Sequence, residues 1–165
     1  MEETEKSNLL KNNQPKIIAA VIAVFVLIAG YFWYDGSQTK EYIQSIQYDV
    51  QSVNQSRTTL EGYEKGGLAF GSFFENTYKI NKDLEKSKEN LNRSMPKNTA
   101  SHAIKKAALD YTDAVTKLCS SANDWRKYEM MNRYNKQGIE KVQKNYFEVK
   151  HDIQPKYDVY NNLVK

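Results

Sequence analysis

Hydrophobic residues recur at intervals of three or four from residue 43 to residue 163, which is the period of an amphipathic α-helix. We call each stripe a seam. The first two seams are Ile43, Ile46, Val50, Val53 and Leu60, then Phe73, Thr77, Ile80, Leu84, Ser87 and Leu91. The last two are Ala100, Ile104, Ala107, Tyr111, Ala114, Leu118, Ala122 and Trp125, then Ile139, Val142, Tyr146, Val149, Ile153, Tyr157, Tyr160 and Leu163. No run alternates like a half-buried strand, so the pattern predicts an all-α fold.

Helix-breaking residues separate the seams. Gly66-Gly67, Met95-Pro96 and Gln137-Gly138 fall between successive seams, and Pro155 predicts a kink in the last one. Short connections between long helices favour an antiparallel up-and-down bundle of about four helices over residues 37–165. Because the seams are narrow, a coiled-coil oligomer is the alternative.

The other pattern is a continuous apolar run without any charge, from Ile17 to Tyr34. Eighteen helical residues span about 27 Å, close to the hydrocarbon thickness of a bilayer. The sequence therefore predicts that residues 17–34 form a transmembrane helix in contact with lipid. Tyr31, Trp33 and Tyr34 end the run, where amphipathic rings suit the membrane interface.

Residues flanking this run predict its limits and its direction. Pro15 suits the first turn of a helix, and Asp35-Gly36 is expected to interrupt the helix beyond the membrane. Residues 1–16 contain Lys6, Lys11 and Lys16, while Lys40 is the one basic residue close on the other side. The positive-inside rule then predicts a short cytoplasmic tail, an uncleaved signal anchor and an extracytoplasmic bundle in a single-pass protein of the cell membrane. A cleaved signal peptide and a buried core helix are the alternatives.

Residues able to carry out catalysis or bind a metal are few. The chain has two histidines and one cysteine, Cys119. Cys119 is expected to be a small buried residue, with an intermolecular disulfide as the alternative. Glu148 and His151 have a metal-binding spacing, but the seam predicts that both face outward and no second copy exists. We therefore expect neither a cofactor, nor a metal, nor an enzyme.

Charge gives little further guidance about partners. The net charge is +4, and Lys and Arg alternate with Asp and Glu instead of forming a stripe. This pattern argues against nucleic acid as a partner.

Two stretches are unusual, GGLAFGSFF and WRKYEMMNRY. The first is itself a connection and the second precedes one, and an up-and-down bundle places both connections at the end far from the membrane. Aromatic, Met and Arg side chains are enriched at protein-binding surfaces. The alternative is that these side chains close the end of the core. The candidate partner-binding residues are Leu68, Phe70, Phe74, Arg126, Tyr128, Met130, Met131, Arg133 and Tyr134.

These features predict a membrane-anchored bundle that binds a protein partner, self-associates, or acts as an assembly or spacing element of the cell envelope. The alternative is a sensor or carrier that binds a small apolar ligand in the bundle core. In that case Arg57, Thr77, Ser87 and Tyr111, which lie at seam positions, would supply the polar contacts.

Overall fold

The structure, a computed structural model, describes the backbone of residues 2–63 and 70–165 and the side chains of residues 21–63 and 71–165. The chain divides into two units, Met1–Gln38 and Thr39–Lys165. Helix α1 (Glu2–Gly62) runs through the first unit and continues into the second. The second unit also contains α2 (Phe70–Arg93), α3 (Thr99–Met131), α4 (Lys136–His151) and α5 (Ile153–Leu163).

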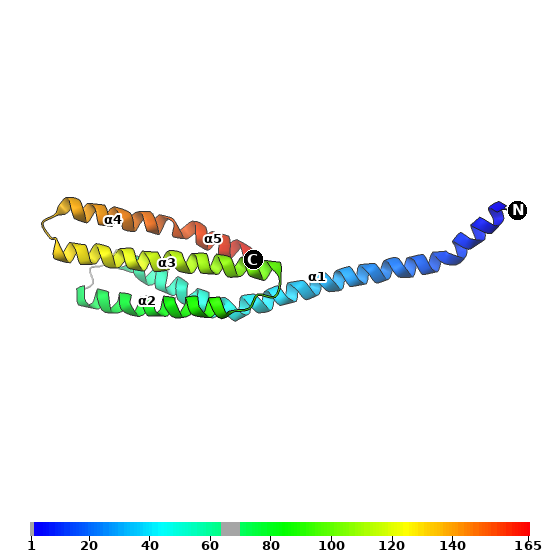
Figure 1. The fold of residues 1–165 in the computed structure, drawn as a ribbon, viewed down its shortest axis with the longest axis horizontal. Helices are drawn as coiled ribbons and strands as arrows, with labels where there is room; N and C mark the ends of the chain where they lie inside the picture. Colours follow the sequence, from blue (N-terminus) through cyan, green and yellow to red (C-terminus); the bar gives the residue numbers. More distant parts are fainter. Residues whose placement is uncertain (1, 64–69) are drawn as a thin grey trace. The chain divides into compact units, whose positions relative to one another are not determined.

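Within the second unit the helices alternate in direction. The part of α1 from Thr39 to Gly62, then α2, α3 and the α4–α5 pair form four antiparallel segments (Figure 1). Helix α3 packs against α2, α4 and α5. Hydrogen bonds tie α1 to the others, such as Tyr111 Oη to Asn54 Oδ1 at 3.0 Å and Arg57 Nη2 to Gln154 Oε1 at 2.8 Å. The predicted all-α up-and-down bundle is confirmed.

The predicted seams form the core of this bundle. Every seam position of α2 is buried, as are Ile46, Val50, Val53 and Leu60 of α1. Ile43 and Trp125 are partly buried against the same core. Two seam positions are wrong, because Ala100 is exposed next to the buried Ser101, and Leu163 is 43% exposed at the end of α5.

Helix α3 buries a wider face than one seam. Beyond the predicted positions, Ala108, Thr112, Val115 and Cys119 are also buried. They form a second stripe beside the first, because α3 contacts neighbours on more than one side. A single narrow seam is expected of a helix that packs against neighbours on one side only.

Two helix boundaries follow the sequence. Asn98 caps α3, with the Ser101 N–H donating to Asn98 Oδ1 at 2.8 Å and the Asn98 N–H donating to Ser101 Oγ at 3.0 Å. The helix after α3 is interrupted at Asp152, between α4 and α5. Pro155 explains this break, because it lacks the N–H that would bond to the His151 carbonyl.

The turn predicted at Gln137-Gly138 is wrong. Asn135 caps α4 by accepting from the Gly138 N–H at 3.0 Å, so both residues lie in the first helical turn. Gly138 provides space instead: a Cβ there would overlap the Tyr128 hydroxyl and lie 2.7 Å from Tyr128 Cζ.

Two predictions about the ends of the apolar helix are also wrong. Helix α1 includes Pro15 and passes without interruption through Asp35 and Gly36. An isolated glycine costs a helix only about 1 kcal/mol relative to alanine, so Gly36 weakens α1 without ending it. Nothing in the structure explains why α1 continues through Pro15. The break predicted at Gly66-Gly67 lies outside the described residues.

Candidate functional site

Aromatic rings close the bundle core where α1 and α3 end and α2 and α4 begin. We call this the α3–α4 end. Tyr63 lies 5.6 Å from Phe73 between ring centroids, and Trp125 lies 5.3 Å from Tyr146. A cavity of only about 10 Å³ remains among the side chains at this end, including Leu60. The core is therefore closed here by close packing.

Two of the predicted partner-binding residues, Arg126 and Phe74, belong to this closure, and a third, Tyr128, contacts the start of α4. The Arg126 guanidinium lies 5.0 Å from the Trp125 ring centroid, and Nη1 donates to Glu129 Oε2 at 2.8 Å. Phe74 is half-buried against the core, and half-buried Tyr128 accepts a hydrogen bond from Asn135 Nδ2 at 3.0 Å. These side chains stabilise the bundle, and the sequence alone could not distinguish this structural role from a role in binding a partner.

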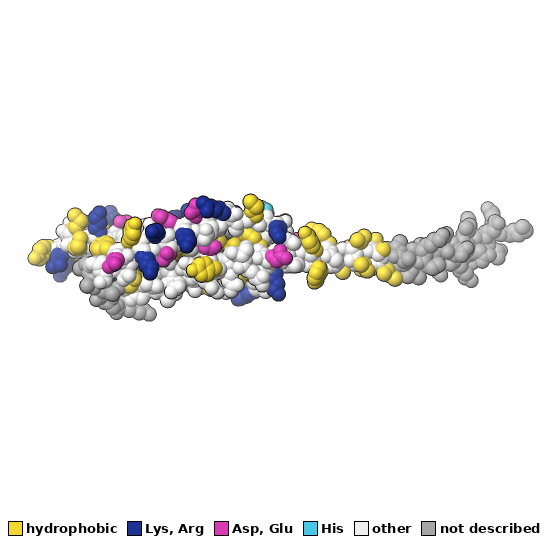
Figure 2. Space-filling view, turned by 90° about the horizontal axis from the view of Figure 1, so that it is seen from below, with side chains coloured by type: hydrophobic (Ala, Val, Ile, Leu, Met, Phe, Trp, Pro, Cys, Tyr) yellow, Lys and Arg dark blue, Asp and Glu magenta, His cyan; other side chains and the backbone are white. Residues whose placement is uncertain are grey.

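The remaining predicted residues at this end that can be described are exposed. Figure 2 shows hydrophobic and basic side chains together at this end of the bundle. Tyr134 is 99% exposed, Met131 68% and Met130 43%. Arg133 is also exposed. We call Met130, Met131, Arg133 and Tyr134 the exposed tip cluster. Leu68 and the side chain of Phe70 lie outside the described residues.

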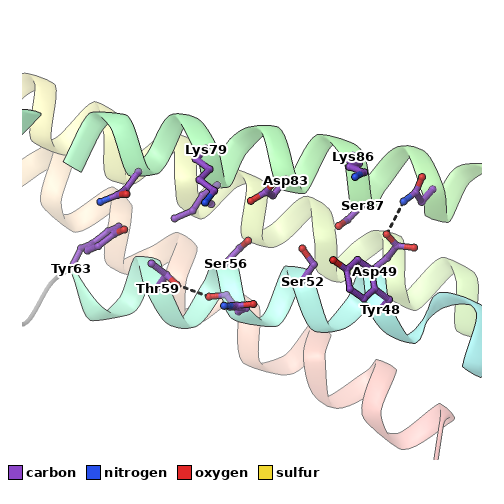
Figure 3. A pocket seen from close by; sticks show the side chains of 14 residues that line it. Tyr48, Asp49, Ser52, Ser56, Thr59, Tyr63, Lys79, Asp83, Lys86 and Ser87 are labelled. Atoms are coloured by element: carbon purple, nitrogen blue, oxygen red, sulfur yellow. Dashed lines mark hydrogen bonds between the residues drawn. The ribbon is translucent and has the colours of Figure 1, made fainter. Parts of the chain in front are cut away.

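A second surface feature is a groove of about 390 Å³ between α1 and α2 (Figure 3). Its lining is mostly hydroxyl, amide and charged side chains, and it includes the buried Ser56 and Ser87. Ser87 lies at a predicted seam position, whereas Ser56 lies outside the predicted seams. A serine at a position expected to face a neighbouring helix was the one sequence feature that could have indicated a polar groove.

The polar residues at seam positions in the core are mostly satisfied internally. Thr77 Oγ1 donates to Asn123 Oδ1 at 2.7 Å. Tyr111 donates to Asn54, and burial raises the pKa of its hydroxyl to about 12. Arg57 Nε donates to Glu61 Oε1 at 2.8 Å. These side chains hold the helices together, which leaves them little capacity to bind an apolar ligand in the core.

The candidate reactive groups are similarly limited. Cys119 is buried, its Sγ lies 3.6 Å from the Thr77 carbonyl oxygen, and burial raises its pKa to about 11. The thiol therefore stays protonated near neutral pH and behaves as a small apolar side chain. His102, Glu148 and His151 are exposed. Over the described residues, no three His, Cys, Asp or Glu side chains come together as a metal site.

One described helix is long and apolar enough to cross a membrane, and it lies near the N-terminus. The side chains from Val21 to Tyr34 are all exposed. Tyr31, Trp33 and Tyr34 are 67%, 77% and 60% exposed.

No protein family matches the chain, and neither the curated proteins nor the solved structures contain a match. The functional conclusion consequently rests on the residues and geometry described above.

Proposed function

We propose that this chain is a single-pass membrane protein whose helical bundle lies outside the cell membrane and docks another protein through the exposed tip cluster. Residues 17–34 cross the bilayer, residues 1–16 remain in the cytoplasm, and the bundle acts as an interaction or assembly module of the cell envelope. The basic residues Lys6, Lys11 and Lys16 support this direction.

The observation that carries the docking proposal is the exposure of the tip cluster beside a core that is already closed. Phe73, Trp125 and Tyr146 seal the core, whereas Met131 and Tyr134 leave most of their surface in solvent. In the described part of the chain, none of these exposed side chains is among the hydrophobic residues packed against the core. Tyrosine, methionine and arginine supply large contact area, adaptable packing and directional hydrogen bonds to a protein partner.

Site-specific photocrosslinking in native membranes tests this role. A photoreactive phenylalanine analogue replaces Tyr134 in one variant and Tyr78 in a matched control, since Tyr78 is a tyrosine that is 73% exposed on α2. We expect a discrete crosslinked product from position 134 alone, and its mass distinguishes a second copy from a different protein. Identical product patterns from both positions would contradict a docking role for the tip cluster.

A further inference from the structure

The connection between α2 and α3 exposes an apolar side chain beside two cations. We call residues 93–98, which end α2 and lead into α3, the basal loop. Met95 is 84% exposed in this loop. Arg93 and Lys97 lie on either side of it, and more than half of each of their side chains is in solvent. An apolar side chain between long basic side chains suits the boundary between lipid headgroups and acyl chains.

Positive charge is in excess around the basal loop. The stretch from residue 90 to residue 109 contains no Asp or Glu. Its cations are Arg93, Lys97, Lys105 and Lys106. Two acidic residues from outside the stretch pair with two of these cations, since Glu89 contacts Arg93 and Glu41 lies 3.2 Å from Lys97 Nζ. Exposed ion pairs of this kind contribute little to stability, so a lipid phosphate can replace either carboxylate. The surplus of cations favours an anionic partner.

Hydrogen bonds hold the basal loop against α1 and α3. Asn98 Nδ2 donates to Thr39 Oγ1 at 2.8 Å, and the Tyr42 and Ser94 hydroxyl oxygens lie 2.8 Å apart. Lys105 Nζ donates to the Ser94 carbonyl at 2.7 Å, which keeps a third cation beside the loop. The loop therefore presents its methionine and its charges in a conformation that is already ordered, so binding costs little further ordering.

The chain itself keeps the basal loop close to the membrane. Thr39 follows Tyr34, the last residue of the apolar run, by five residues. Five residues span at most about 18 Å even when fully extended. Because Asn98 is bonded to Thr39, the loop stays near the lipid surface whatever the direction of the bundle. A membrane surface is therefore the partner that this loop meets at the highest effective concentration.

We propose that the basal loop docks the bundle on the membrane surface by binding anionic lipid headgroups. Arg93 and Lys97 pair with lipid phosphates, and Met95 enters the apolar edge of the headgroup layer. The proposal rests on the membrane anchor proposed above. The exposed tip cluster follows α3 whereas the basal loop precedes it, so the two sites lie at opposite ends of this helix.

Fluorescence quenching in lipid nanodiscs tests this contact on the full chain. In a Cys119→Ala background, Met95→Cys carries an environment-sensitive dye, and the nanodiscs contain a lipid with a nitroxide on its headgroup. Nanodiscs of phosphatidylcholine alone are compared with an equal mixture of phosphatidylcholine and phosphatidylglycerol. Each cation near an anionic surface favours contact about fivefold, so quenching should be at least about twofold stronger in the mixture. Concentrated salt should remove this difference, because it screens exposed charges.

A second labelled position shows whether the contact is local. Met131→Cys carries the same dye at a methionine that is 68% exposed beyond the other end of the bundle core. We expect weak quenching there in both lipids. Equal quenching at positions 95 and 131, or quenching at position 95 that does not depend on phosphatidylglycerol, would overturn the proposal.

Charge-neutralising substitutions show which cations recognise the lipid. Arg93→Gln combined with Lys97→Gln should remove most of the additional quenching that phosphatidylglycerol causes at position 95. Lys82→Gln combined with Lys86→Gln is the matched control, since it makes the same change in net charge at exposed positions of α2. Equal losses in the two double variants would contradict recognition by the basal loop.

Incorporation of the chain into the nanodiscs tests the anchor separately. A chain that fails to incorporate would overturn the membrane anchor and this proposal with it. A chain that incorporates but shows no quenching at position 95 would overturn the basal-loop contact alone.

Discussion

Replacing Leu118 by alanine should strongly destabilise the bundle, because this side chain is fully buried in α3, the helix that packs against α2, α4 and α5. The substitution removes three carbon groups, at about 0.8 kcal/mol each for lost burial. The cavity left in a close-packed core adds about 1–2 kcal/mol. We therefore expect a loss of about 3.4–4.4 kcal/mol, which for a bundle of this size lowers the melting temperature by about 14–18 °C.

The matched control for this measurement is Leu163→Ala, the same chemical change at a leucine that is 43% exposed near the end of α5. It should cost less than about 1 kcal/mol. Circular dichroism of the full chain in a nonionic detergent monitors both unfolding transitions. Equal losses at positions 118 and 163 would refute the assignment of the core.

Other perturbations act on the caps, the α3–α4 turn and the buried titratable groups. The bundle should lose stability as pH rises from about 9 to 12, because burial raises the pKa of Cys119 from 9.0 to about 11 and of Tyr111 from 10.0 to about 12, while both ionise earlier in the unfolded chain. A melting temperature that is flat over this range, or a drop not reduced in Cys119→Ala, would contradict the burial. Asn98→Ala should lower stability by about 1–2 kcal/mol in urea unfolding, because it removes the cap of α3; a loss no larger than that of Asn92→Ala, an exposed asparagine, would contradict this role. Gly138→Ala should displace the Tyr128 ring, which a change in the tyrosine NMR signals would report, and an unchanged ring environment would argue against the close contact.

Hydrophobic periodicity predicted most of this fold, because a helix that packs against other helices buries the side chains on one face, and these recur every three or four residues. In α1 and α2 one narrow stripe of side chains faces the rest of the bundle, and the predicted seams match the buried residues there. The seam of α3 was too narrow, since its additional stripe, with Val115 and Cys119, depends on how many helices surround α3. That number is a property of the packed bundle and is absent from the local pattern.

Sequence breakers predicted connections less well than seams predicted burial. The last helix is interrupted just before Pro155, as expected from its missing N–H, whereas Pro15 does not interrupt α1. Asp35-Gly36 does not end α1, since glycine weakens a helix without preventing it. Gly138 leaves space for the Tyr128 side chain, a contact that the sequence does not reveal.

The candidate site was predicted only in part. The expected up-and-down topology and the side-chain composition grouped Arg126, Met131 and Tyr134 at one end, but they could not separate core-closing side chains from exposed ones. The α1–α2 groove was missed because a buried serine in a sequence resembles a weak core position.

The central claim is that one N-terminal helix holds the bundle outside the cell membrane, and cysteine labelling tests it most directly. In a Cys119→Ala background, Tyr134→Cys and Ser7→Cys are treated with a membrane-impermeant maleimide on intact spheroplasts that express the full chain. The account predicts that position 134 is labelled on intact cells and position 7 only after lysis. Labelling of position 134 only after lysis would contradict the account. Recovery of the full-length chain in the soluble fraction without detergent would also contradict it.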